Sequence, residues 1–223
     1  MACGVRIEVY MLWNKMATDD FYTDIIELAR ECSKTTEEAL RGLDRDDFSE
    51  VYLFMDHDPQ SRTQLGVGGD INCVMQEMLN TFDNETENGK LYISYPMIEA
   101  IRDLRRNDNC YRKCFVIIDD LGRYKEQSAE GSDFLDFRKL DYASWKTLCK
   151  HAVRKANCIV SSMYEVPSYL FFANALGQSQ LFSHQLDKYI AYGKVAVISS
   201  IPLFLLEYHK EEFWNLIFGV AVV

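Results

Sequence analysis

The sequence predicts an α/β protein. We expect a partly parallel sheet flanked by helices over residues 1–120, and a mainly helical C-terminal extension over residues 121–223 that packs on it. Over the first 120 residues, short apolar β-rich runs alternate with segments of helical spacing, which is typical of strands joined by helices. From about residue 121, a polar connector leads into segments that combine helical spacing with large aromatic residues.

Four runs are expected to form strands. They are residues 5–12, the stretch VYLFMDHD that starts at residue 51, residues 91–95 and residues 114–120. Between them we expect a helix capped by Thr18, a second over residues 35–43 with a capping box of Thr35 and Glu38, and a third over residues 71–82. A fourth helix follows residue 95, with Pro96 in its first turn.

Composition limits the classes of function. The 223 residues are 48% hydrophobic, which is enough to bury the core of one domain, or of one domain with an appended lobe. A net charge of −10 repels polyanions and argues against non-specific coating of nucleic acid, although a local basic patch could still contact phosphate.

The first ten residues lack a signal-peptide pattern and no apolar run is long enough to span a bilayer, so we expect a cytoplasmic protein with no membrane partner. The seven scattered cysteines indicate reduced, mostly buried thiols.

The acids that end the strand at residue 51 suggest a metal site. Because side chains alternate along a strand, Asp56 and Asp58 share one face and His57 takes the other. Two such close anions repel, and a hard cation such as Mg²⁺ relieves the repulsion. The alternative is a simple acidic turn. Three further acids follow other predicted strands and favour the metal: Glu99, Asp119 and Asp120.

These motifs, in this order, resemble the TOPRIM domain of OLD-type nucleases and related abortive-infection proteins of bacterial phage defence. The resemblance covers about residues 5–120. It implies a nuclease that uses Mg²⁺ or Mn²⁺ to cleave phosphodiester bonds in DNA or tRNA. It also implies that Asp56 and Asp58 are both catalytic and metal-binding, and that Glu99 assists in holding the metal.

The first motif departs from the family pattern, which reads Glu-Gly-x-Thr/Ser-Asp. In KMATDDFY, Lys15 stands in place of that Glu and Met16 in place of the Gly. A lysine desolvated to neutrality could act as a base, and Glu8 could substitute if its strand face points to the metal. The alternative is a non-catalytic relative: a binding or assembly subunit of a defence complex, with a protein partner or a second copy of itself.

One basic segment lies near the expected site. Arg102, Arg105 and Arg106 could contact a nucleic-acid backbone or an acidic face of a partner, and the alternative is a solvated helix end. The loop GVGG at residues 66–69 lacks the spacing of known phosphate-binding loops, and we interpret it as a flexible connection.

Overall fold

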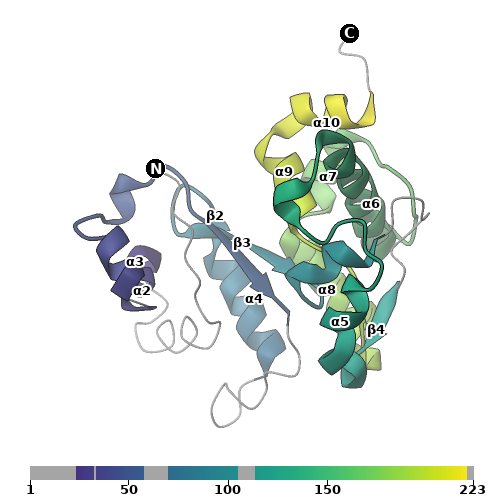
Figure 1. Ribbon diagram of the computed structural model, residues 1–223, viewed down its shortest axis with the longest axis horizontal. Helices are drawn as coiled ribbons and strands as arrows, with labels where there is room; N and C mark the ends of the chain where they lie inside the picture. Colours follow the sequence, from purple (N-terminus) through teal and green to yellow (C-terminus); the bar gives the residue numbers. More distant parts are fainter. Residues whose placement is uncertain (1–23, 33, 58–69, 105–113, 220–223) are drawn as a thin grey trace. The chain divides into compact units, whose positions relative to one another are not determined.

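The computed structural model of the chain describes residues 24–32, 34–57, 70–104 and 114–219 (Figure 1). The chain divides into two compact units, residues 1–53 with 61–91 and residues 54–60 with 92–223. The domain boundary expected near residue 120 stays a prediction. The mixed α/β class is confirmed, because helices and small strands alternate along the described residues.

In the first unit, the helices are α2 (Ile25–Cys32), α3 (Lys34–Ala39), the 3-10 turn η1 (Arg45–Asp47) and α4 (Ile71–Thr81). Helix α2 packs against α3. The side chain of Asp70 accepts a hydrogen bond from the Asn72 amide and caps α4, as its position before an apolar stripe favours. The buried side of α4 follows the helical period: Ile71, Val74, Met75, Met78 and Leu79.

Three strands form one sheet in the order β1-β3-β2, where β1 is Tyr52–Asp56, β2 is Asp83–Asn84 and β3 is Gly89–Ser94. Strands β2 and β3 are antiparallel. The Lys90 amide donates to the Val51 carbonyl, and the His57 amide donates to the Ser94 carbonyl. These bonds advance in the same direction along both segments, so β1 and β3 run parallel, as predicted.

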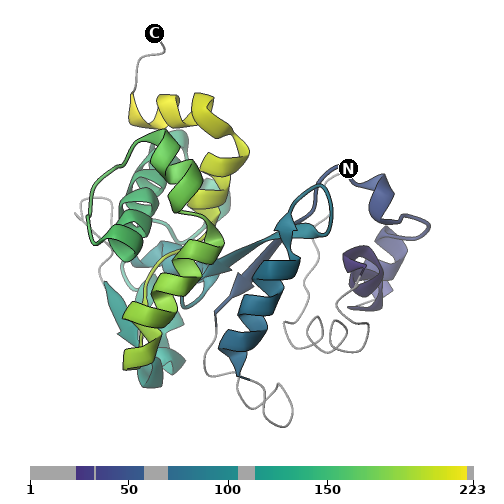
Figure 2. The ribbon, with the colours of Figure 1, turned by 180° about the vertical axis from the view of Figure 1, so that it is seen from behind.

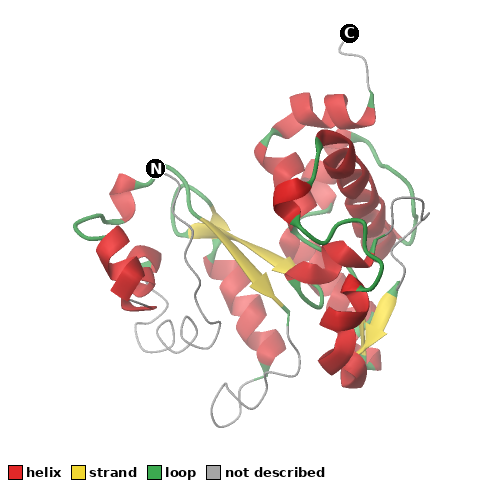
Figure 3. Cartoon of the chain, viewed as in Figure 1, coloured by secondary structure: helices red, strands yellow, loops and turns green. Residues whose placement is uncertain are grey.

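The second unit is mainly helical, as Figure 3 shows. It contains the 3-10 helices η3 (Ile98–Asp103), η4 (Ile118–Arg123), η5 (Phe137–Lys139) and η6 (Ile190–Tyr192). Its α-helices are α5 (Tyr124–Ala129), α6 (Tyr142–Ser161), α7 (Tyr169–Ala175), α8 (Gln178–Lys188), α9 (Ile201–Tyr208) and α10 (Lys210–Phe218). Helix α6 contacts α8, α9 and α10, an arrangement that Figure 2 shows from behind. The helical C-terminal prediction is therefore confirmed for most of this region.

A two-stranded antiparallel sheet also belongs to the second unit. Strand β4 (Phe115–Ile117) pairs with β5 (Lys194–Ala196), with Val116 opposite Val195. The core beside it combines η3, β4, η4, α5 and α6. It comprises Ala100, Ile101, Leu104, Val116, Leu121, Tyr124, Phe134, Leu148 and Val197.

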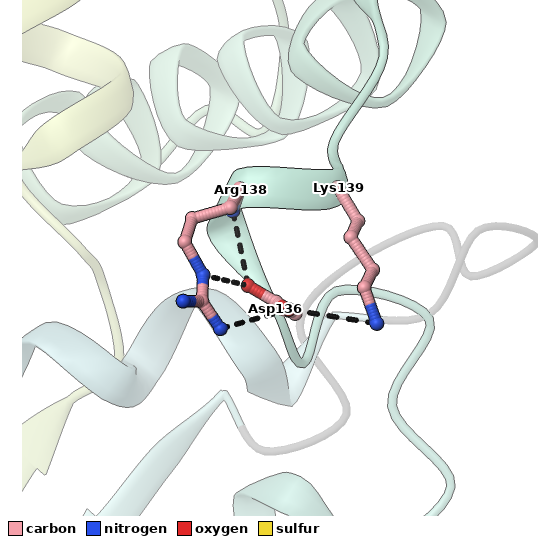
Figure 4. Close-up of polar contacts among 3 residues, drawn as sticks. All are labelled: Asp136, Arg138 and Lys139. Carbon is pink, nitrogen blue, oxygen red and sulfur yellow. Dashed lines mark hydrogen bonds and ion pairs between the residues drawn. The ribbon is translucent and has the colours of Figure 1, made fainter.

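Figure 4 shows the polar contacts that hold the 3-10 turn η5. Asp136 accepts hydrogen bonds from the backbone amide and the guanidinium of Arg138.

Several local predictions were wrong. Thr35 lies inside α3 and not at its N-cap. A capping box exists instead at η1, where Asp44 accepts from the Asp46 amide and the Asp47 carboxylate accepts from the Asp44 amide. The segment after residue 95 forms a 3-10 helix that starts at Ile98, so Pro96 precedes it.

The strand predicted over residues 114–120 is shorter and is paired differently from our expectation. It ends at Ile117, because Leu121 and Tyr124 reach the core through the turn η4 that follows. Its described partner is antiparallel β5, in a region that we expected to be mainly helical. Of the described cysteines, Cys73 and Cys114 are exposed, so the expectation of mostly buried thiols is wrong for these two.

The expected strand at residues 5–12 and the helix cap at Thr18 lie outside the described residues.

Candidate functional site

Asp56 ends β1 and is partly exposed, whereas its neighbours Met55 and His57 are buried. This alternation agrees with the prediction that Asp56 and His57 point to opposite faces. The Asp56 carboxylate accepts a hydrogen bond from the Ile98 backbone amide, with 2.6 Å between Oδ1 and N. Ile98 is the first residue of η3, so Asp56 lies beside the turn that carries Glu99.

His57 is part of the core. It is fully buried, and its ring centroid lies 5.3 Å from that of Tyr95 and 6.1 Å from that of Phe182. Its backbone amide donates to Ser94, the last residue of β3. His57 therefore fixes the end of β1, and with it the position of Asp56.

Glu99 is held by a lysine that the sequence did not lead us to expect. Its Oε1 lies 2.6 Å from Nζ of Lys125 in α5, and the Glu99 side chain is 13% exposed. Burial raises the pKa of Glu99, but the hydrogen bond from Lys125, a backbone hydrogen bond and the charges of Lys125 and Arg102 outweigh it, so that the pKa is lowered overall. Glu99 is thus a carboxylate at neutral pH.

Arg102 lies in the last turn of η3, with its guanidinium carbon 5.6 Å from the centroid of the Phe137 ring. This distance allows a cation–π contact. Arg102 is therefore engaged within the protein and also adds positive charge near Glu99. The two other arginines of the predicted contact, Arg105 and Arg106, lie outside the described residues.

The remaining predicted site residues are distributed as follows. Glu8, Lys15 and Asp58 lie outside the described residues. Asp119 and Asp120 are exposed in the first turn of η4, and not at the end of a strand as we expected. Within the described part of the chain, no three His, Cys, Asp or Glu side chains gather closely enough to hold a metal ion. The arrangement that the structure does provide is Asp56 beside the turn of Glu99.

An apolar pocket lies next to Asp56. Its volume is about 650 Å³, and it is lined by Phe54, Ile98, Tyr142, Trp145, Ile201, Phe204, Leu205 and Phe213. Phe54 precedes Asp56 by two residues, so both side chains lie on the same face of β1. The Phe54 ring stacks on Tyr92 with 5.5 Å between centroids, and meets Phe204 edge to face at 5.1 Å. An acidic group and an aromatic pocket thus adjoin at the end of one strand.

Sequence reasoning missed Lys125 and this pocket. Lys125 lies in a segment that we interpreted as a polar connector, whereas residues 124–129 form α5. The buried residues of α5 are Tyr124 and Ser128, four residues apart, but only the first is a large apolar side chain, so the sequence carried little helical signal. The pocket gathers residues from β1, η3, α6, α9 and α10, and no local pattern connects them.

Comparison with protein-family models, with curated proteins and with solved structures found no match to this chain. Among the helices that the structure describes, none has the length and apolar character needed to cross a membrane.

Proposed function

We propose that the chain is a TOPRIM-like, Mg²⁺-dependent nuclease that acts in the cytoplasm in bacterial anti-phage defence. One observation supports this proposal above the others. The hydrogen bond from the Ile98 amide to Asp56 brings an acid at the end of a strand beside the turn that carries Glu99. An acid at the end of β1 and the turn that carries a second acid are therefore joined by one hydrogen bond.

The chemistry of these groups suits a hard divalent cation. Mg²⁺ and Mn²⁺ prefer oxygen ligands, and Asp56 and Glu99 both supply carboxylate oxygens. A carboxylate has about four acceptor positions, so the amide of Ile98 uses only part of the capacity of Asp56. When bound, such a metal would stabilise charge on a phosphate group. In the proposal, Asp58 completes the metal ligands, and Lys15 or Glu8 contacts the phosphate or relays a proton.

Substrate selection is part of the proposal. With a net charge of −10, the protein repels nucleic acid at long range, so binding would depend on local cations such as Arg102, Arg105 and Arg106. DNA and tRNA are the two substrates to be compared.

Metal titration followed by a nuclease assay tests the proposal. The full chain is unfolded by heat with and without Mn²⁺ or Mg²⁺, because a bound metal stabilises the folded state by about 2.7 kcal/mol at 100 times Kd. Asp56→Asn removes the charge but keeps an oxygen for the Ile98 amide. Asp136→Asn is the matched control, since Asp136 is also an aspartate that accepts a backbone amide hydrogen bond, here from Arg138.

The expected result is cleavage that requires metal, is lost in Asp56→Asn and persists in Asp136→Asn. A stable protein that shows neither metal stabilisation nor cleavage of DNA or tRNA would refute the proposal.

A second candidate function is supported by a different observation. Lys125 already neutralises Glu99, and the apolar pocket beside Asp56 is lined by aromatic side chains that suit a protein contact. The chain would then be a non-catalytic binding or assembly subunit, either for a larger effector or for a second copy of itself.

Self-association through the pocket is tested by light scattering over a range of concentrations. Leu205→Glu places a charge in the pocket, and Leu170→Glu places the same charge on α7 at a leucine that is 71% exposed. Assembly through the pocket predicts that only Leu205→Glu lowers the mass of the particle. Equal masses for both variants and the wild type would exclude assembly of this kind.

A further inference from the structure

Cys114 and Lys155 form a close pair in the second unit. Nζ of Lys155 lies 3.0 Å from Sγ of Cys114 and 2.6 Å from the Cys114 carbonyl oxygen. Lys155 belongs to α6 and is fully buried, whereas Cys114 is exposed and directly precedes β4. A solvent-accessible sulfur therefore contacts a buried amine.

Because Lys155 is buried, the partners of its amine are important for its stability. An ammonium group removed from water is costly unless it meets hydrogen-bond acceptors and an opposite charge. Among the described residues, the recorded partners of Nζ are the carbonyl and the sulfur of Cys114. Only the sulfur of these two can become an anion, so a thiolate beside an ammonium satisfies the lysine best.

The backbone around Cys114 keeps the sulfur in place. The Cys114 carbonyl also accepts the Val197 amide at 3.1 Å, and β4 begins at the next residue, where Phe115 pairs with Ala196. Nζ of Lys194 lies 4.6 Å from the centroid of the Phe115 ring. These contacts hold the Cys114 segment against β5, and Lys155 from α6 is the cation that lies against its sulfur.

We propose that Cys114 is a modification site, a thiolate held by Lys155 that reacts with peroxides and with soft carbon electrophiles. With hydrogen peroxide, the thiolate sulfur attacks one oxygen, an S–O bond forms and the O–O bond breaks. The sulfur gives two electrons to the peroxide, hydroxide leaves, and Cys114 becomes a sulfenic acid. This inference does not depend on the proposed nuclease function.

Two other thiols of the chain serve as internal references. Cys73 is exposed on α4, and the described residues place no cation within hydrogen-bond distance of its sulfur. Cys149 is buried, and burial raises its pKa to about 12. Cys73 therefore serves as the exposed reference thiol, and labelling of Cys149 shows whether the protein stays folded.

Alkylation of the reduced, folded full chain by iodoacetamide tests the proposal. The rate at each cysteine is followed by mass spectrometry of its peptide between pH 5.5 and 8.5. Because thiolates and not thiols react, Cys114 is expected to react at least about fivefold faster than Cys73 at pH 6.5. Its rate should also fall less steeply with decreasing pH. If the wild-type rate at Cys114 is less than about fivefold the rate at Cys73, the proposal is overturned, whatever the variants show.

Variants then identify the source of the reactivity. Lys155→Met is expected to bring the rate at Cys114 down to that of Cys73, and Lys155→Arg to retain most of the advantage. Lys150→Met, in the same helix, is the matched control and should leave the rate unchanged. Trapping with dimedone after peroxide should label Cys114 ahead of Cys73, and equal labelling of both would contradict the oxidation step.

Discussion

Asp56 accepts a 2.6 Å hydrogen bond from the backbone amide of Ile98, 42 residues further along the chain. The first amide of a helix has no partner within the helix, and Met97, at the N-cap position of η3, makes no side-chain cap hydrogen bond. Asp56 supplies the acceptor for this amide instead. Asp56, at the end of β1, therefore caps the N-terminus of η3. The same contact ties Asp56 to the turn that carries Glu99, the two acids on which the proposed function rests.

Removing this acceptor is expected to destabilise the protein. Asp56→Ala leaves the Ile98 amide without its acceptor and should lower the free energy of unfolding by about 1 to 2 kcal/mol. Asp56→Asn keeps an oxygen at this position and should cost less than half as much. Urea denaturation followed by circular dichroism measures both values. Equal losses for the two variants would show that the charge matters and the hydrogen bond does not.

The position of Asp56 was partly predictable from sequence, and that of Glu99 less so. Alternation along residues 52–57 is a local property, so the opposite orientations of His57 and Asp56 followed from the pattern. The helix that carries Glu99 was expected to be α-helical, and it is a 3-10 helix whose first amide is satisfied from another strand. Propensity alone contains no information about such a distant acceptor.

Distant partners, which local propensity does not encode, also explain the strands that were missed or misplaced. Strand β5 lies in KVAVISS, an alternating β-branched run that could have been recognised. This run lies between two segments of helical spacing, and our expectation of a mainly helical C-terminal part did not single it out as a strand. The antiparallel pairing of β4 with β5 joins Val116 to Val195, and nothing near either residue in the sequence specifies this partner.

The ion pair between Glu99 and Lys125 predicts a pH-dependent contribution to stability. Because the pKa of Glu99 is lowered in the folded state, the pair stabilises the protein above the ordinary carboxyl value of 4.5. That contribution is lost as the pH falls through the folded-state pKa. Lys125 is 65% exposed, so Lys125→Met should cost only about 0.5 kcal/mol at pH 7.

The control for this prediction is Lys139→Met, which removes an exposed lysine 3.7 Å from Asp136. It should change the free energy of unfolding by less than Lys125→Met at pH 7. Unfolding by urea at pH 7 and at pH 3 separates the two contributions. A cost of Lys125→Met that is equal at both pH values would contradict an origin in the Glu99 carboxylate.

Gln185 is expected to be one of the more important polar residues of the second unit. It is fully buried, its Nε2 donates to the Ala196 carbonyl at 2.8 Å, and its Oε1 accepts from the Ala196 amide at 3.0 Å. The side chain thus pairs with β5 as a neighbouring strand would. Gln185→Ala leaves both backbone groups buried without these partners and should cost about 2 to 4 kcal/mol.

Gln180 lies on the same helix and is exposed, which makes Gln180→Ala the matched control for Gln185→Ala. Its cost should stay within about 0.5 kcal/mol. Chemical denaturation of both variants provides the comparison. Similar costs would mean that water replaces the lost partners of Ala196 and that the pairing contributes little.

Gly89 begins β3 with φ of +109°, and a Cβ added there would lie 2.8 Å from Cδ1 of Leu53. Gly42 has φ of +75°, and a Cβ there would meet nothing within 4 Å. Gly42→Ala therefore carries only the backbone cost, about 1 to 2 kcal/mol, while Gly89→Ala adds the clash and should cost about 1 kcal/mol more. In a Leu53→Ala background the added cost should disappear, because the clashing atom is gone while the backbone strain remains. A cost of Gly89→Ala that is independent of Leu53 would assign the whole effect to the backbone.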